Sequence, residues 1–472
     1  MEEQETQQQE KFIKMTQTPV PRLICGLAAP CILSMLITSF YNMADTYFVS
    51  RIGTSATAAV GVVFSLMAVI QALGFTFGHG SGNYISRQLG KHQTEDASIM
   101  AATGFFSAVL AGCIITVLGL AFLRPLVREL GATETIEPYA VDYAWYILLG
   151  APFMMGSLVL NNQLRFQGSP ASGMIGMCSG GILNIALDPL FIFGFHMGIK
   201  GAAAATMVSQ AVSFIILFVM CRRGGNIPVY FRNFKPSLAR YKEIIRGGVP
   251  SLARQGIASV ATIFLNRAAG IYGDAAIAAM SIVMRVTNFA GSALIGFGQG
   301  FQPVCGFNYG AKLYGRVRSA FWFCVKSSTG FLILIAALGF VFAPQIIGMF
   351  RDDPDVIAVG TVVLRLQCIT FPTFSWTTMS NMMLQTMGKA VRATILSLSR
   401  QGLFFIPAIW ILSELMGLRG LELCQSAADI GSLVLAVPMA ARVLRDFKRK
   451  TEQQTETADE SKVRCANEKE RE

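Results

Sequence analysis

Apolar segments long enough to cross a membrane recur along the whole of this 472-residue chain. Clear examples lie at 101–123, 171–194, 201–221, 325–343 and 391–413. Each holds about 20 residues with few charges, and a helix of that length crosses a hydrocarbon core about 30 Å thick. Only 14% of the residues are charged, whereas a soluble globular chain carries about a quarter. The sequence therefore predicts a polytopic membrane protein.

Turn signals between the apolar segments divide the chain into twelve expected spans. The first six lie near 20–49, 55–78, 97–123, 138–160, 171–194 and 201–221. The second six lie near 247–271, 275–300, 320–343, 355–383, 391–415 and 420–441. An even number of spans returns both termini to the same side. We therefore expect an all-α protein with twelve transmembrane helices and its termini on one side.

Basic residues indicate that this side is cytoplasmic. The net charge of +11 is concentrated in every second connection, at 222–246, 312–318, 389–392 and 442–450. This alternation follows the positive-inside rule for loops of membrane proteins. Because the charge is divided among loops, no nucleic-acid partner is expected.

Both ends of the chain are polar. The first 14 residues are polar and acidic, unlike a cleavable signal peptide. From Lys448 onward the chain is polar and charged, a composition typical of disorder. We expect a cytoplasmic N-terminal tail over 1–19 and a disordered cytoplasmic tail over 442–472.

The two sets of spans repeat one another with a shift of 220 residues. Three aligned pairs are Pro30 with Pro250, Gly80 with Gly300, and Asn161 with Asn381. A six-helix repeat keeps its orientation, so the halves are related by a pseudo-two-fold axis along the membrane normal. We expect an N-terminal lobe over 20–221 and a C-terminal lobe over 247–441, joined by the basic linker 222–246. Paired lobes of this kind are typical of secondary transporters.

Polar side chains lie deep in the spans of the first half. They are Asn42, Asp45, Tyr143, Asn184, Asp188 and Thr206. An acid within a span costs about 2.5–3.5 kcal/mol on insertion scales, so it is a candidate functional residue. Two carboxylates with amide, hydroxyl and phenol oxygens could hold a monovalent cation or protons. The alternative is that each acid pairs separately with a backbone donor or an arginine.

Helix geometry adds detail to this set. Asn184 and Asp188 are four residues apart and so share one helix face. Pro189 follows them, and Pro30 lies about four turns before Asp45. Proline removes a backbone donor and favours a kink, so we expect irregular helices beside both acids.

The second half carries no acid at the equivalent positions. By the repeat shift, Asp45 falls on Leu265 and Asn184 on Phe404. Arg254 and Arg267 are either snorkelling residues near helix ends or functional residues. Asp429 either packs against a polar neighbour or takes part in transport. Further candidates for the substrate cavity or for gating are Asn42, Pro30, Gln163, Gln255, Arg285, Gln299, Gln302 and Asn308.

Nucleotide and catalytic motifs are missing from the sequence. It contains no GxxxxGK[ST] motif, which argues against an ATP-driven pump in this chain. Its three histidines form no HExxH motif and have no metal-ligand spacing. We expect a protein that is not an enzyme and has no cofactor or structural metal.

Several motifs in order resemble the multidrug and toxic compound extrusion (MATE) family, in its MepA-like bacterial branch. They are ADTYFVSRIGTSATAAVG from Ala44, RFQGSPASG from Arg165, ILNIALDPLFIFG from Ile182, GDAAIAAMSIVMRV from Gly273 and GQGFQPVCGFNYGA from Gly298. The resemblance covers roughly residues 20–445. It implies two lobes around a V-shaped cavity that opens alternately to either side. It also implies multidrug efflux of cationic compounds in exchange for protons or sodium.

The resemblance also carries over a cation site in the N-terminal lobe. The family's positions match Asp45, Tyr143, Asn184, Asp188 and Thr206, with any Na⁺ held at Asp45, Asn184 and Asp188. Another branch of the family places its acids in the seventh and tenth helices. Here span seven has Gln255 and span ten has no deep acid, so no cation site is expected in the second lobe. The expected form is a monomer in the bacterial cytoplasmic membrane.

Two rival functions remain open on the sequence. One is a flippase for lipid-linked precursors, or a metabolite exporter, from the wider superfamily. Such flippases often have more than twelve spans and a strongly cationic cavity, so the charge of the cavity discriminates. The other is a channel or receptor, for which the short polar tails leave no signalling domain.

Overall fold

The computed structural model describes residues 2–469, and within them the chain forms helices and no strand. The first half supplies α2 (Val20–Ser50), α3 (Thr54–Gly90), α4 (Thr94–Ala121), α6 (Glu137–Phe166), α7 (Pro170–Pro189) with the π-turn η1 (Leu190–Gly194), and α8 (Ile199–Met220). The second half supplies α9 (Leu238–Gly270), α10 (Asp274–Gly310), α11 (Tyr314–Val341), α13 (Pro354–Thr370) with α14 (Thr373–Thr386), α15 (Ala390–Leu398) with the π-turn η3 (Ser399–Leu403) and α16 (Phe405–Met416), and α17 (Leu418–Lys469). Shorter helices are α1 (Glu2–Gln17), α5 (Leu123–Glu129), η2 (Phe231–Asn233) and α12 (Ala343–Phe350).

These helices account for twelve membrane spans. Among the described residues, ten helical segments are long and apolar enough to cross a membrane, and α13 with α14, bent by 56°, makes an eleventh. The twelfth is α9, which is long enough but is made more polar by Arg254, Gln255 and Arg267. The prediction of an all-α protein with twelve spans is confirmed.

Several helices extend beyond the apolar segments that predicted them. Both α3 and α10 have 37 residues, which at 1.5 Å per residue gives about 55 Å. That exceeds a hydrocarbon core of about 30 Å, so both helices project beyond it. The apolar pattern ends near residues 78 and 300, and hydropathy alone therefore missed these polar helical ends.

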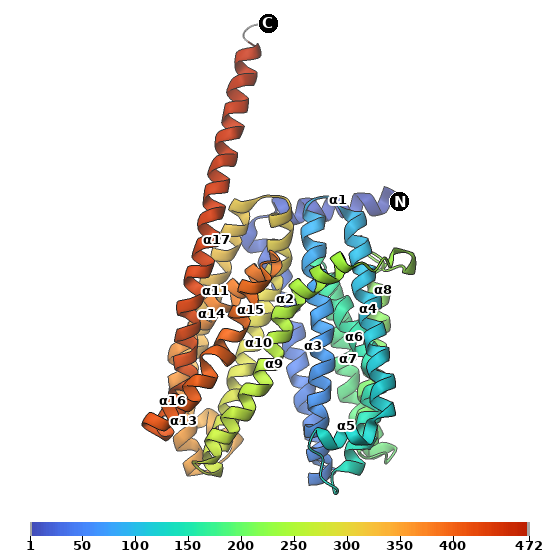
Figure 1. Ribbon diagram of the computed structural model, residues 1–472, viewed down its shortest axis with the longest axis vertical. Helices are drawn as coiled ribbons and strands as arrows, with labels where there is room; N and C mark the ends of the chain where they lie inside the picture. Colours follow the sequence, from blue (N-terminus) through green and yellow to red (C-terminus); the bar gives the residue numbers. More distant parts are fainter. Residues whose placement is uncertain (1, 470–472) are drawn as a thin grey trace.

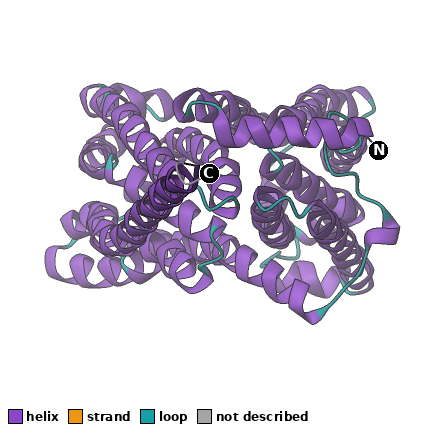
Figure 2. Ribbon diagram, turned by 90° about the horizontal axis from the view of Figure 1, so that it is seen from above, coloured by secondary structure: helices purple, strands orange, loops and turns teal. Residues whose placement is uncertain are grey.

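The helices form two bundles that lie side by side (Figure 2). Buried apolar side chains form a large cluster in each half, with Phe105 and Tyr143 in the first and Phe301 and Phe321 in the second. The first turns of α2 are an exception, because Leu23, Ile24 and Leu27 pack into the cluster of the second half. The helix that carries Asp45 therefore touches both bundles.

The bundles meet closely at the end of the molecule that carries both termini (Figure 1). A Cβ atom on Gly80 of α3 would lie 2.1 Å from the Ile244 carbonyl oxygen of α9. A Cβ atom on Gly300 of α10 would lie 2.6 Å from the Ala28 Cα atom of α2. Gly80 and Gly300 are equivalent in the repeat, so the same contact occurs twice. We call these paired contacts, α3 with α9 and α2 with α10, the glycine seam.

Hydrogen bonds join the bundles at the same end. The Arg87 guanidinium of α3 pairs with Glu243 of α9 at 3.1 Å and donates to the Thr386 carbonyl oxygen of α14 at 2.8 Å. Nearer the middle, Ser251 Oγ lies 3.2 Å from His79 Nδ1. The structure is therefore a state in which the two bundles are joined at the end of the termini.

The N-terminal segment is a docked helix. Helix α1 lies across the end of the bundles (Figure 1). Met15 is buried, and its carbonyl oxygen accepts a hydrogen bond from Asn308 Nδ2 of α10 at 3.1 Å. Lys11 Nζ donates to Asn226 Oδ1 of the linker at 2.6 Å. Residues 2–17, expected as part of a tail, thus hold the linker and the second bundle together.

The last span and the segment predicted as a C-terminal tail are parts of one long helix. Helix α17 continues from the last span to Lys469 and projects away from the bundles (Figure 1). Val443, Leu444 and Phe447 are buried against the second bundle, which extends the helix beyond the membrane. The residues that follow are mostly Glu, Gln, Lys and Thr, and the first three favour helices. Residues 470–472 lie outside the described part of the chain.

Candidate functional site

Asp188 and Asn184 lie one turn apart at the end of α7 and face α8. Both side chains are buried, and Asp188 has no exposed surface. Asn184 Nδ2 donates to Asp188 Oδ1 at 3.3 Å and to Thr206 Oγ1 of α8 at 3.4 Å. One amide therefore ties a carboxylate and a hydroxyl from neighbouring helices together.

Asp45 of α2 and Tyr143 of α6 complete the group. The carboxylates of Asp45 and Asp188 lie within electrostatic range of each other. The buried Tyr143 phenol lies beside Thr206 and within range of both carboxylates. The structure thus brings together all five residues that the family resemblance implied. We call Asp45, Tyr143, Asn184, Asp188 and Thr206 the oxygen cluster.

Three oxygens of the oxygen cluster have no hydrogen-bond partner although they are buried. They are Asp45 Oδ1, Asp188 Oδ2 and Tyr143 OH, from three different helices. A buried carboxylate oxygen without a donor carries a large desolvation cost unless a cation or a proton compensates it. Hard oxygen donors of this kind suit a monovalent cation or protons. Among the residues described, no group of three or more His, Cys, Asp or Glu could hold a metal ion.

The backbone becomes irregular directly after Asp188. Helix α7 ends at Pro189 and passes into the π-turn η1. Proline has no N–H to continue the α-helical pattern, which explains why the change occurs there. Turns of this type are frequent at functional sites. Around Pro30, in contrast, α2 continues as one helix from Val20 to Ser50.

Tyr41 is a neighbour of the oxygen cluster that sequence reasoning missed. It lies one turn before Asp45 on α2, within electrostatic range of that carboxylate. Its ring faces Gly181 of α7, where a Cβ atom would lie 3.3 Å from Tyr41 Cδ1. The spacing of four residues from Asp45 was the available signal.

The second bundle contains a cavity of about 370 Å³ between α9, α10, α14 and the α15–η3 segment. We call it the C-lobe cavity. Its lining is mostly polar and includes Gln255, Asn288, Thr377, Asn381 and Ser397. The only charged residues of this lining are Arg254 and Arg400.

Arg400 is paired at the wall of the C-lobe cavity. Its Nε donates to Asp429 Oδ1 of α17 at 2.7 Å, and its guanidinium lies 4.0 Å from the Phe374 ring centroid. Asp429 also accepts hydrogen bonds from Gln425 at 2.9 Å and Thr370 at 3.2 Å. The sequence left two alternatives for Asp429, packing against a polar neighbour or a role in transport. These hydrogen bonds fit the first alternative.

Arg254 has a different environment. It lies in the middle of α9, not at a helix end, and is within electrostatic range of Arg165 and His79. Among the described residues it has no hydrogen bond or ion pair. Arg267, in contrast, is exposed in the last turn of the same helix, where a snorkelling side chain is expected.

The remaining candidates for cavity or gating lie in several places. Gln163 donates to Ser81 Oγ and the Ala101 carbonyl oxygen, both at 3.0 Å, inside the first bundle. Gln302 is buried in α10, and Gln299 Nε2 lies 3.9 Å from Met35 Sδ across the two bundles. Asn42 and Arg285, two further candidates, have exposed side chains.

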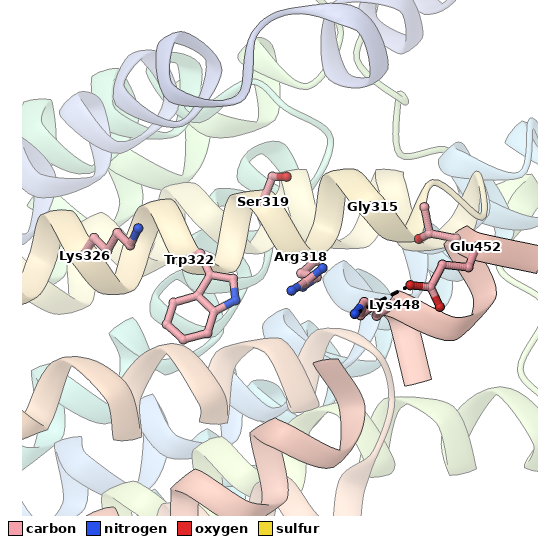
Figure 3. Close-up of a pocket in the computed structure, with 8 residues that line it drawn as sticks. Gly315, Arg318, Ser319, Trp322, Lys326, Lys448 and Glu452 are labelled. Carbon is pink, nitrogen blue, oxygen red and sulfur yellow. Dashed lines mark ion pairs between the residues drawn. The ribbon is translucent and has the colours of Figure 1, made fainter. Parts of the chain in front are cut away.

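A larger cavity of about 660 Å³ lies away from these groups, between α11 and α17. Arg318, Trp322 and Lys326 line it at intervals of four residues along α11, and Lys448 faces them from α17 (Figure 3). Lys448 Nζ pairs with Glu452 Oε1 at 3.7 Å. The lining of this cavity therefore places basic side chains at the end of the molecule that carries the termini.

Comparisons with known proteins agree with this architecture. The family model MatE matches the chain twice, over residues 30–190 and 250–411. The two matches begin 220 residues apart, which is the shift of the internal repeat.

Similar proteins match over nearly their whole length. The "Multidrug export protein MepA" of Staphylococcus haemolyticus is 27% identical over 415 residues, which cover 87% of this chain and 91% of that protein. The protein of the same name from Staphylococcus aureus is 26% identical and covers 93% of this chain and 97% of its own. A solved structure, described as the outward-facing conformation of a multidrug resistance MATE family transporter of the MOP superfamily, has a TM-score of 0.87 at 26% identity and covers 93% of this chain and 98% of its own. Two matches to one family model across a duplicated twelve-helix fold show that this chain belongs to the MatE family of membrane transporters.

Proposed function

We propose that the protein is a secondary active efflux transporter that exports cationic organic compounds by antiport with H⁺ or Na⁺. The observation that carries this proposal is the oxygen cluster, in which Asp45, Asp188 and Tyr143 present unpartnered buried oxygens. A site that exchanges an ion must bind the ion strongly enough to hold it and weakly enough to release it. Carboxylates whose charge is only partly compensated by the protein have that property.

In the proposed cycle, a proton or Na⁺ enters from outside and binds to Asp45 and Asp188, which reduces the charge of the pair from −2 to −1. Loss of one negative charge relieves the repulsion between the carboxylates and favours a rearrangement of α2, hinged near Pro30. The rearrangement weakens the hold on the substrate, which leaves outward, and the ion is released after the lobes reorient. Only a difference in ion affinity between the two states can drive this change.

The lobes supply the moving parts of the proposed cycle. We take 20–221 and 247–441 as the two units and 222–246 as the connection between them. The glycine seam closes one end, and its opening gives access from that end. Three features support this division: the repeat, the two apolar clusters and the double match to the family model.

We further propose that the end with the termini is cytoplasmic and that the protein is a monomer in a bacterial cytoplasmic membrane. The basic connections at 222–246, 312–318 and 389–392 support the orientation through the positive-inside rule. The described state then faces outward, because its bundles are joined at the cytoplasmic end.

The flippase alternative requires a strongly cationic cavity. The C-lobe cavity has one unpaired guanidinium, Arg254, because Arg400 pairs with Asp429. The oxygen cluster of the first bundle carries two carboxylates. Drug antiport fits this distribution better, and the relatives are named multidrug export proteins.

The test is efflux from vesicles loaded with a fluorescent organic cation. A pH gradient and a sodium gradient are imposed separately, which identifies the coupling ion. We expect gradient-driven efflux for the wild type and its loss in Asp45→Asn and in Asp188→Asn. The matched control is Asp142→Asn, which removes a carboxylate that pairs with Lys200 at the surface of the same lobe.

Gradient-driven efflux that persists in both Asp45→Asn and Asp188→Asn contradicts the proposed coupling site. Ion currents without saturable exchange indicate a channel instead. Equal loss of efflux in Asp142→Asn shows that the assay reports damage to the lobe and not ion coupling.

A further inference from the structure

The oxygen cluster of the first bundle and the lining of the C-lobe cavity carry charges of opposite sign. The oxygen cluster of the first bundle contains Asp45 and Asp188 and no basic residue. The lining of the C-lobe cavity contains Arg254 and Arg400 and no acidic residue. A transporter for simple cations has no use for guanidinium groups in such a cavity, since they repel its substrate.

The internal repeat shows that this difference is local. Arg254 is equivalent to Ser34, and Arg400 to Gly180, so the first bundle has small residues at both positions. Conversely, Asp45 is equivalent to Leu265 and Asp188 to Ala408. Each of these four charged residues therefore has a neutral residue at the equivalent position of the other bundle.

Of the two arginines that line the C-lobe cavity, Arg254 is the one whose charge is not balanced by an ion pair. Within the described chain it makes no ion pair or hydrogen bond, although it is part of the cavity lining. Arg254 lies within electrostatic range of Arg165, buried on α6, and of His79, and neither residue carries a negative charge. Arg165 itself has buried Nε and Nη1 atoms without partners.

An unpaired guanidinium in a partly enclosed site attracts an anionic group. Its planar fork of N–H donors matches a carboxylate and forms two parallel hydrogen bonds with it. The remaining lining supplies the hydroxyl and amide groups of Thr377, Asn381 and Ser397 and the aromatic ring of Phe374. A volume of about 370 Å³ falls within the range of small-molecule sites, about 300–1,000 Å³.

We propose that Arg254 binds the carboxylate of zwitterionic substrates in the C-lobe cavity. The exported compounds then include organic molecules that carry a carboxylate in addition to a cationic group. This inference rests on the proposed efflux function and names a substrate class for it. The Arg400–Asp429 pair is neutral in sum and leaves Arg254 as the group that selects for the carboxylate.

The test compares two dyes that differ only in the anionic group. A cationic rhodamine methyl ester carries one positive charge, and the same rhodamine as the free acid is a zwitterion. Binding of each dye to the purified full-length protein is measured by fluorescence polarisation without an ion gradient. Export of each dye from proteoliposomes is measured in parallel.

We expect the wild type to bind and export the free acid. Arg254→Gln should weaken binding of the free acid about tenfold or more, the effect of losing one charge-assisted hydrogen bond. Binding of the ester should change less than about twofold. The matched control is Arg267→Gln, which removes an exposed arginine from the same helix and should leave both affinities unchanged.

Two results would overturn the proposal: no binding of the free acid by the wild type, or equal losses for both dyes in Arg254→Gln. If Arg254→Gln does not fold, Arg254→Lys serves as the second variant, because it keeps the charge but loses the planar fork. It should still weaken binding of the free acid more than binding of the ester. Dye binding is measured without an ion gradient, so it tests the role of Arg254 independently of ion coupling. The result stands even if Asp45→Asn leaves efflux intact and so contradicts the proposed coupling site.

Discussion

At the scale of single residues, the oxygen cluster could be predicted and its surroundings could not. Asp45 and Asp188 stand out because acids are rare within apolar spans, and four-residue spacing joins Asn184 to Asp188. Tyr41 has the same four-residue spacing from Asp45, but an aromatic residue in an apolar span is ordinary, so the spacing did not single it out. The unpaired state of Arg254 depends on what lies around it in three dimensions, and no local pattern encodes that.

Tyr143→Phe tests whether the phenol takes part in ion binding. The hydroxyl is buried and unpartnered, so its removal should cost little folding stability. If the phenol oxygen contacts the ion, the half-saturating ion concentration for antiport should rise about tenfold, equivalent to about 1.4 kcal/mol. Efflux is measured over a range of ion concentrations, with Tyr139→Phe, an exposed tyrosine one turn earlier on α6, as the control. Unchanged ion dependence in Tyr143→Phe places the phenol outside the ion site.

Asp429→Asn tests whether Asp429 serves stability and not coupling. Asp429 is almost fully buried against Arg400, whose side chain is 19% exposed. Breaking a buried pair leaves one charge unpaired and costs about 3–5 kcal/mol, so a partly exposed partner suggests about 3 kcal/mol. We expect a lower melting temperature with unchanged ion dependence of efflux. The double variant Arg400→Gln with Asp429→Asn should regain much of the lost stability, and a further loss contradicts this role.

At the scale of elements, apolar patterns predicted the spans but not the ends of the helices. The predicted start of each span lies within about six residues of the observed start, except for α9, which begins earlier in the basic linker. The ends of α3 and α10 project beyond the membrane because polar residues there pack against the other bundle. Helix α1 was missed as an element because its composition is polar, and its contacts with Asn226 and Asn308 come from distant parts of the chain.

Docking of α1 should strengthen as the pH rises above about 8. Partial burial, with a smaller effect of Lys14, lowers the pKa of Lys11 from 10.5 to about 8. Below pH 8 the lysine is charged in both the docked and the undocked helix, and the cost of burying the charge is fully present. Between about pH 8 and 10.5 only the undocked helix remains charged, so docking becomes more favourable as the pH rises.

A fluorophore attached through Gln9→Cys in a cysteine-free background reports this docking. Its anisotropy should increase between about pH 7 and about pH 10 as α1 becomes less mobile. Lys11→Met removes the titrating group, so this variant should show no such increase. The same pH dependence in Lys11→Met would assign the effect to another group.

The glycine seam should control which end of the transporter is open. A side chain at Gly80 cannot fit, since its Cβ atom alone would lie 2.1 Å from a backbone oxygen of α9. Gly80→Leu should therefore separate the bundles at the end of the termini. The change can be measured by double electron–electron resonance between spin labels attached through Glu95→Cys and Arg318→Cys. The distance between these labels should be longer in Gly80→Leu than in the wild type. Gly61→Leu on the same helix, where a Cβ atom meets nothing within 4 Å, should leave the distance unchanged.

At the scale of the whole molecule, the repeat predicted two similar bundles, and the structure adds their specialisation. The oxygen cluster of the first bundle holds Asp45 and Asp188, the C-lobe cavity of the second is lined by Arg254 and Arg400, and the glycine seam joins the two bundles. The repeat could be found because equivalent residues are conserved in spacing along one chain. The relation between ion site and seam could not, since it depends on how α2 contacts both bundles.

If the two lobes move together, ion binding and closure of the glycine seam are coupled. The ion then stabilises the closed state, and closure increases the affinity for the ion. The oxygen cluster is assembled in the state with the seam closed, so we expect the ion to bind that state more tightly. By thermodynamic linkage, a variant that opens the seam must then weaken ion binding by the same factor by which the ion favours closure. Gly80→Leu should raise the half-saturating ion concentration, and adding the ion to the wild type should shorten the distance between the labels at 95 and 318. A change in only one of these two measurements separates the ion site from the movement of the lobes, and Gly61→Leu should change neither.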